Sequence, residues 1–298
     1  MYNSNNEFFM SPKNDYVFKK IFGDENNKDI LSSFLSCVIN EQINDVSILN
    51  NEITKESTAD KKSILDIRAT INDGVQIDIE IQLSRTIYMP ARSLYYWSKI
   101  YMEQLQIGQI YKKLNRTICI NILDFISTES KKYHSVYRLK ETEENFELTN
   151  LMEIHFIEIP RLKGYEKNDV LSQWINFINA DSREELKKMA IVNKNIDKAF
   201  DILNVMSQSK EERAAYLSRE MALHDEVTKL EEALQEGRQE GRQEGRQEGL
   251  EEGRQEGLEE GEKKKALEIA KNLLDILDNE TIAIKTGLTL DEIENLRK

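Results

Sequence analysis

The sequence predicts an α/β fold in which a mixed β-sheet is flanked by helices. Within residues 64–83, the segments 65–71 and 75–83 alternate strictly between apolar and polar side chains, which is the pattern of two half-buried strands. Short apolar segments elsewhere alternate with longer amphipathic segments, as expected for strands covered by helices. The chain has 298 residues, which is enough to bury a large core.

The elements are expected in the following order. A helix over residues 12–22 ends at Gly23, and a second amphipathic helix covers residues 26–40. A strand over residues 46–53 precedes the alternating segment, and Pro90 lies in the first turn of a helix that extends to about Ile107. Further strands are expected over residues 117–125, 133–139 and 154–159, and further helices over residues 169–178, 182–188, 196–206 and 210–234. The strand over 117–125 is mostly apolar, so it is expected to be central in the sheet.

The alternating segment is expected to form a β-hairpin. A three-residue loop over residues 72–74 gives three opposed pairs: Asp66 and Glu80, Arg68 and Asp78, and Ile64 and Gln82. Such a loop is a type I turn closed by a left-handed residue, for which Gly74 is best suited. A two-residue turn would shift the register by one residue and turn every side chain to the other face, so the apolar pattern favours the longer loop.

Asp66 and Glu80 are the candidate metal ligands. Directly opposed Cβ atoms lie about 4.5–5.5 Å apart, so the two carboxylates repel each other unless a cation lies between them. Mg²⁺ binds carboxylate oxygens at about 2.0–2.1 Å and fits this gap, with Mn²⁺ as its substitute. The pattern indicates metal-assisted phosphodiester hydrolysis, in which Gln82, on the same face, orients water or contacts the phosphate. The alternative is a solvent-facing hairpin with ordinary Asp–Arg pairing.

Asp66 followed by Glu80-x-Gln82 resembles the PD-(D/E)XK nuclease motif, with Gln82 in place of its Lys. The surrounding sequence is similar to the PD-(D/E)XK-type transposases, or recombination-promoting nucleases, of bacteria. The matching segments are residues 14–23, 59–69, 79–82, 92–101 and 120–125 and the Glu-Gly-Arg-Gln repeat. The resemblance implies a restriction-endonuclease-like core and a Mg²⁺-dependent DNA endonuclease that acts in recombination or DNA mobility. Because Gln82 has no charge, it leaves open how active the enzyme is.

Other polar residues are candidates for the same site. Asp15 is a candidate catalytic acid, with a helix N-cap as the alternative. Lys19 and Lys20 on the first helix, and Arg92 and Lys99 on a later one, are candidate DNA-binding residues because their cations can contact phosphate. The two cysteines and three histidines have no metal-ligand spacing, so we expect reduced thiols, structural histidines and no small-molecule organic cofactor.

The net charge of −13 is unevenly distributed. Residues 1–120 carry 14 Lys and Arg against 15 Asp and Glu, so the expected catalytic half is nearly neutral. DNA binding is therefore expected to be modest and strongly salt-dependent. The sequence has no apolar run of about 18 residues and no signal peptide, so we expect a cytoplasmic protein with no membrane partner.

Glycine recurs every four residues from Gly237 to Gly261, mostly within Glu-Gly-Arg-Gln. On an α-helix this period drifts by about 40° per repeat, each Glu meets another Glu at i+4, and each Gly costs about 0.8–1 kcal/mol relative to Ala. Such a helix should not persist alone, whereas two helices could approach closely along Gly and pair the Glu of one chain with the Arg of another. We therefore expect a homo-oligomer formed through the repeat, with right-handed winding. A flexible charged linker is the alternative.

Residues 279–296 resemble a helix–turn–helix sequence, with Gly287 in the turn and Thr289 as a cap. Three acids in its second helix disfavour phosphate contact, so a small packing or dimer module is expected there. The chain is thus expected to divide into a nuclease-like domain (1–190), a helical extension (191–234), the repeat (235–262) and a small helical tail (263–298).

Three functions follow from these features. A metal-dependent DNA endonuclease agrees with most of them. A catalytically weak or inactive DNA-binding or oligomeric accessory protein on a nuclease scaffold is the second possibility, because of Gln82. An assembly module driven by the repeat is the third.

Overall fold

The computed structural model describes residues 8–50, 66–163, 169–191 and 193–297. The chain divides into two compact units, Met1–Asp225 and Glu226–Lys298. No helix within the described ranges is both long enough and apolar enough to cross a membrane.

The first unit is built on a six-stranded mixed sheet with the strand order β1-β2-β3-β4-β6-β5. β3, β4 and β6 are parallel, whereas β1 and β2 on one side and β5 on the other run antiparallel to their neighbours. β4 is buried along its whole length, as its apolar sequence predicts. The strands are β1 Val46–Ile48, β2 Ile67–Ile71, β3 Val75–Gln82, β4 Thr117–Leu123, β5 His134–Tyr137 and β6 Met152–Glu158.

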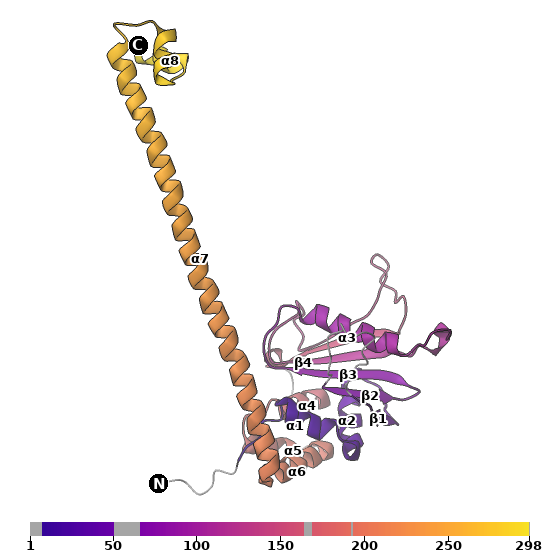
Figure 1. Cartoon of the computed structure of the whole chain (residues 1–298). Coiled ribbons are helices and arrows are strands. Elements are labelled where there is room, and N and C mark those ends of the chain that lie inside the picture. Colours follow the sequence, from indigo (N-terminus) through magenta and orange to yellow (C-terminus); the bar gives the residue numbers. More distant parts are fainter. Residues whose placement is uncertain (1–7, 51–65, 164–168, 192, 298) are drawn as a thin grey trace, which may run out of the picture. The chain divides into compact units, whose positions relative to one another are not determined.

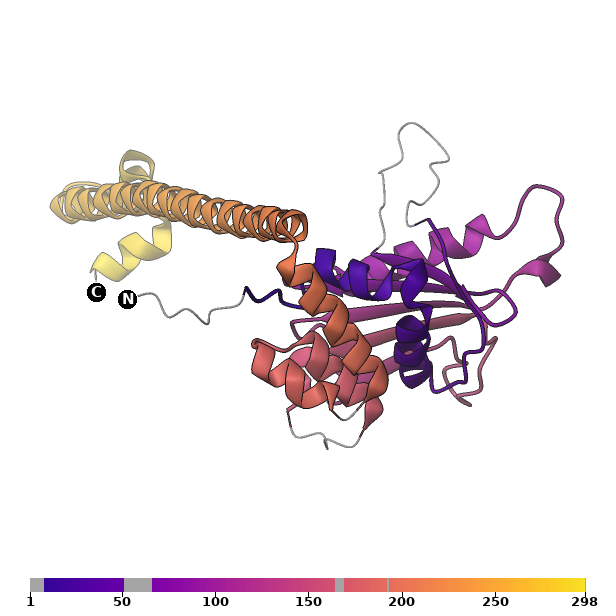
Figure 2. The same cartoon turned by 90° about the horizontal axis from the view of Figure 1, so that it is seen from below.

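Helices cover both faces of this sheet (Figures 1 and 2). On one face, α3 packs on Cys119, Leu123 and Phe156. On the other face, α1, α2, α4, α5 and α6 form the main core around the fully buried Trp174. The expected α/β fold with helices on both faces of a mixed sheet is therefore confirmed. The helices are α1 Asp15–Phe22, α2 Lys28–Ile39, α3 Met89–Glu103, α4 Val170–Ile178, α5 Arg183–Ala190 and α6 Lys194–Gln208, with short 3₁₀ turns at Glu25–Asn27, Tyr111–Lys113 and Ile159–Arg161.

The hairpin loop has the expected length but not the expected turn type. Ile71 pairs with Val75, and Arg68 pairs with Asp78, so the predicted register is confirmed for these strands. Ile64, expected opposite Gln82, lies outside the described residues. Asn72, Asp73 and Gly74 have φ values of 20°, 46° and 87°, whereas a type I turn has negative φ at its two central residues.

The side chain of Asn72 explains this difference. Its Oδ1 accepts a hydrogen bond from the N–H of Asn44 at 2.9 Å, and its Nδ2 donates to the carbonyl of Gln42 at 2.8 Å. These bonds attach the loop to the segment that precedes β1. Asn and Asp are the non-glycine residues that best tolerate positive φ, so the loop can adopt this backbone.

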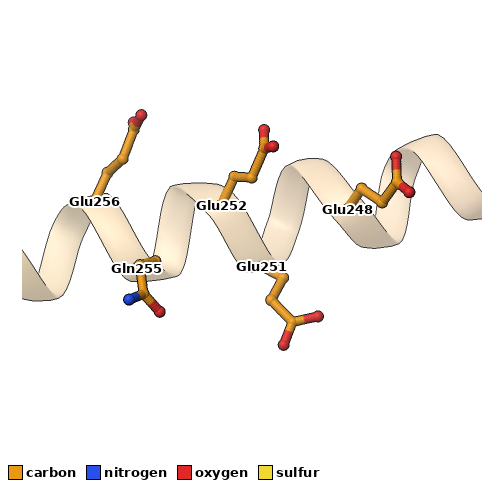
Figure 3. A pocket seen from close by; sticks show the side chains of 5 residues that line it. All are labelled: Glu248, Glu251, Glu252, Gln255 and Glu256. Carbon is orange, nitrogen blue, oxygen red and sulfur yellow. The ribbon is translucent and has the colours of Figure 1, made fainter.

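The helix that was expected over residues 210–234 is much longer, because α7 runs from Lys210 to Leu273 and includes the repeat. The repeat side chains are exposed, and Figure 3 shows Glu248, Glu252 and Glu256 on one side of the helix with Glu251 and Gln255 on the other. A Cβ added to any repeat glycine would have no neighbour within 4 Å in the described part of the chain.

The end of α7 forms a small core with α8 (Asn279–Thr286) and α9 (Leu290–Arg297). Ala270, Ile282 and Ile293 are fully buried there. Gly287 has φ 74° and ends α8, as the sequence predicts. Thr289 Oγ1 accepts a hydrogen bond from the N–H of Glu292 at 3.3 Å, which confirms its expected role as a cap.

Candidate active site

Asp66 and Glu80 lie together where β2 begins. Ile67 pairs with Ile79, so Asp66, one residue earlier, lies opposite Glu80. The N–H of Asp66 donates to Glu80 Oε1 at 3.2 Å, and the N–H of Ile81 donates to Asp66 Oδ2 at 2.9 Å. Each carboxylate therefore accepts a backbone hydrogen bond from the segment that carries the other acid.

Each of the two acids is also paired with a cation from a different helix. Lys19 Nζ of α1 lies 2.9 Å from Asp66 Oδ1. Arg92 NH2 of α3 lies 3.2 Å from Glu80 Oε2, and the Arg92 guanidinium lies 5.2 Å from the centroid of the Tyr96 ring. Helices on opposite faces of the sheet thus each contribute one positive charge to the same pair of carboxylates.

Glu80 is 3 % exposed, and this burial dominates its electrostatics. Burial, and after it the negative charge of Asp66, raise the pKa of Glu80 to about 7, while the positive charge of Arg92 opposes this rise. Near neutral pH, Glu80 is therefore balanced between its neutral and ionised forms. A divalent cation at this position would favour the ionised form.

Asp78 is a buried acid whose environment the sequence did not reveal. It faces Arg68 in the ladder as predicted, but the Arg68 guanidinium lies 2.8 Å from Glu103 Oε2 of α3. Asp78 is 1 % exposed, and its Oδ1 has no hydrogen-bond partner among the described residues. Burial raises the pKa of Asp78 well above its ordinary value, and the charge of Glu80 adds to this effect.

Gln82 and Asp15 make contacts with other groups. Gln82 is the last residue of β3, and its Nε2 donates to the carbonyl of Ser84 at 3.2 Å. The carboxylate of Asp15 binds Arg219 of α7, with Oδ2 lying 2.6 Å from Arg219 NH2. The N-cap of α1 is Asn14, whose side chain accepts from the N–H of Tyr16 at 3.0 Å. Catalytic roles for Gln82 and Asp15 remain predictions.

The remaining candidate DNA-binding residues, Lys20 and Lys99, lie in other surroundings. Lys20 Nζ is 3.1 Å from Glu212 Oε1 and 5.6 Å from the centroid of the Tyr16 ring. Lys99 Nζ is 5.1 Å from the centroid of the Tyr95 ring on the same helix. Of the four predicted cations, the structure brings Lys19 and Arg92 to the two acids.

A family model for PD-(D/E)XK nuclease family transposases matches residues 12–233. The chain belongs to this family, which implies a nuclease-like function. The match includes both acids and both cations described above. Comparisons with curated proteins and with solved structures gave no significant match.

The donor set at the site suits a hard divalent cation. Mg²⁺ is usually held by one or two carboxylates and keeps several waters or substrate phosphate oxygens. Among the residues that the structure describes, no group of three or more His, Cys, Asp or Glu side chains is arranged to hold a metal ion. Asp66 and Glu80 would therefore provide only part of the coordination shell, and water molecules or phosphate oxygens of the substrate would complete it.

Proposed function

We propose that this protein is a metal-dependent DNA endonuclease that hydrolyses phosphodiester bonds during DNA recombination or mobility. The observation that carries this proposal is the hydrogen-bonded juxtaposition of Asp66 and Glu80 at the start of β2. Membership of a nuclease and transposase family supports DNA as the substrate.

Asp66 and Glu80 would hold a single Mg²⁺, or Mn²⁺ in its place. The ion would supply Lewis acidity toward the phosphoryl oxygen and would lower the pKa of bound water. The protein's own residues position the two carboxylates through the N–H groups of Asp66 and Ile81. Lys19 and Arg92 neutralise the acids before the ion and the DNA arrive.

The second candidate function is a weak or inactive DNA-binding protein on the same scaffold. Gln82 favours it, because this side chain carries no charge and donates to the carbonyl of Ser84. Nicking of supercoiled plasmid at low salt separates the two functions. We expect Mg²⁺-dependent nicking that Asp66→Ala and Glu80→Ala abolish and that Gln82→Lys retains or increases. If the wild type shows no nicking with Mg²⁺ or Mn²⁺, the second function is favoured.

We also propose that a second copy of the chain pairs with the repeat part of α7. At about 100° per residue, Glu lies on one flank of the Gly stripe, Arg lies on the other flank, and Gln lies on the far side. In a parallel pair the Glu flank of one helix meets the Arg flank of the other on both sides. An antiparallel pair would instead oppose like charges, so the flanks favour parallel helices.

Sedimentation of matched variants tests this pairing. Two sets of substitutions each lower the charge by the same amount: Arg238→Gln with Arg242→Gln and Arg246→Gln, and Gln239→Glu with Gln243→Glu and Gln247→Glu. The Arg set changes the flank, so it should weaken association, whereas the Gln set changes the far side and should have little effect. If the wild type and a variant that lacks residues 237–261 both sediment as monomers, the proposed pairing is wrong.

A further inference from the structure

The motif position that carries a lysine in related nucleases holds Gln82 in this chain. A phosphodiester gains negative charge as it reaches the transition state, and a positioned donor or cation there stabilises it. Gln82 has no charge to contribute, and its amide donates to Ser84 at 3.2 Å. The positive charge must therefore come from another element.

Lys19 lies in position to supply it. Gly23 ends α1 and lies so close to β2 that an added Cβ would be 3.4 Å from Ile67 Cγ1. The end of α1 is thus packed beside the first residue of β2, which places Lys19, one turn before Gly23, 2.9 Å from Asp66 Oδ1. The Lys19 side chain is 33 % exposed, so it is accessible to a ligand from solvent.

We propose that Lys19 supplies from α1 the positive charge at the scissile phosphate that Gln82 does not provide. An ammonium has three N–H donors, so Lys19 can bind Asp66 and still donate to a non-bridging phosphate oxygen beside it. The proton stays on Nζ throughout. The oxygen of a water molecule forms the new bond to phosphorus, one P–O ester bond breaks, and the leaving oxygen receives a proton from the water.

Two other cations in the described part of the chain, Arg92 and Lys20, are less suited to this role. The Arg92 side chain is 38 % exposed, but its guanidinium has two partners, since it binds Glu80 and lies over the face of the Tyr96 ring. Lys20 is the next residue on α1, but it binds Glu212 of α7 and lies over Tyr16. Lys20 therefore provides a matched control, since it carries the same charge on the same helix but contacts a different part of the fold.

The inference rests on the proposed nuclease function, and plasmid nicking in Mg²⁺ with four variants tests it: Lys19→Met, Lys19→Gln, Lys20→Met and Lys19→Met combined with Gln82→Lys. Loss of one transition-state donor lowers rates by about 100- to 1,000-fold, which is the effect expected for Lys19→Met and Lys19→Gln. Lys20→Met should lower the rate at least about tenfold less than Lys19→Met does, because it can remove a contact with the DNA backbone but no charge at the scissile phosphate. The double variant should nick at least about tenfold faster than Lys19→Met alone, because the change at position 82 places a positive charge at the site from β3.

Two binding measurements separate this role from a structural one. Titration calorimetry with Mn²⁺ should show that Lys19→Met binds the ion at least as tightly as the wild type, because the lysine no longer competes for Asp66. DNA affinity in Ca²⁺ should change by less than about fivefold, since one phosphate contact is lost.

Wild-type nicking rates in both Lys19 variants would overturn the inference and leave the nuclease function intact. Weaker Mn²⁺ binding by Lys19→Met, a loss of activity in Lys20→Met that equals the loss in Lys19→Met, or no recovery in the double variant would also overturn it. Absence of nicking by the wild type itself would instead overturn the proposed function, and this inference with it.

Discussion

Replacing Glu80 by Gln should stabilise the metal-free protein at alkaline pH. Burial and the neighbouring Asp66 raise the pKa of Glu80 to about 7 from an ordinary value of 4.5. Between these two values the folded state holds more protons than the unfolded state, so the free energy of unfolding falls as pH rises. At about 1.4 kcal/mol per tenfold change, ionised Glu80 costs the folded state about 3 kcal/mol above pH 7.

Gln has nearly the same shape and removes this cost, but it also leaves Arg92 without its carboxylate partner. We therefore expect Glu80→Gln to gain about 1–3 kcal/mol at pH 8 and close to nothing at pH 4.5 or below. Urea unfolding in a chelator between pH 4.5 and 8 measures the difference. The chain has two Trp residues, Trp97 and Trp174, and both lie in the first unit, so Trp fluorescence reports the unfolding of that unit.

Adding Mg²⁺ provides the matching control. A ligand that binds only the folded state at 100 times its Kd stabilises it by about 2.7 kcal/mol. We expect this gain in the wild type and not in Glu80→Gln. A variant that is less stable than the wild type at pH 8, or a difference that does not change with pH, would refute the reasoning about Glu80.

Two further predictions concern the hairpin loop and the repeat. Asn72→Ala should destabilise the first unit by about 1–2 kcal/mol in urea unfolding, because it removes the side-chain hydrogen bonds to Gln42, Asn44 and Asp45 at a position with positive φ. Asn72→Asp keeps an acceptor toward Asn44 and should lose less, and equal losses of the two variants would contradict this account. Substituting Gly241 and Gly245 by Ala should raise helix content in circular dichroism, since each change favours helix by about 0.8–1 kcal/mol, while it weakens association in sedimentation because the added Cβ atoms hold two helices apart. Stronger association of this variant would argue against close packing through glycine.

The central part of the candidate site could be predicted because a hairpin is a local structure. Period-two alternation and a loop that contains Gly74 were enough to align Arg68 with Asp78 and to bring Asp66 opposite Glu80. The turn type was wrong, because the backbone of Asn72 depends on contacts with Gln42 and Asn44. Those contacts join segments that the hairpin pattern does not describe.

The partners of the two acids could not be predicted, since they are brought in by tertiary packing. Lys19 was expected to contact DNA, and no pattern in the sequence indicated that α1 would place it beside Asp66. Asp78 was correctly placed on the polar face of β3. Its raised pKa arises because α3 covers that face, and no pattern within the strand carries this information.

The length of α7 shows a similar limit. Glycine every four residues suggested either a linker or a helix that needs a partner, yet three of every four repeat positions hold residues such as Glu, Gln and Arg, which favour helix. The sequence also has no proline after Pro160, so nothing forces the helix to end. Propensity summed over the whole segment therefore agrees with the helix observed from Lys210 to Leu273.

Identical four-residue steps make the alignment of two such helices degenerate. If one chain slides along the other by four residues, about 6 Å, nearly every Glu finds an equivalent Arg. Between Gly237 and Gly261 the exceptions that distinguish one alignment from the next are Leu250 and Leu258, which stand where the repeat otherwise has Arg, and Glu251 and Glu259, which stand where it otherwise has Gln. Chains that gain or lose one four-residue step should therefore still pair with the parent chain, which makes this segment tolerant of changes in its own length.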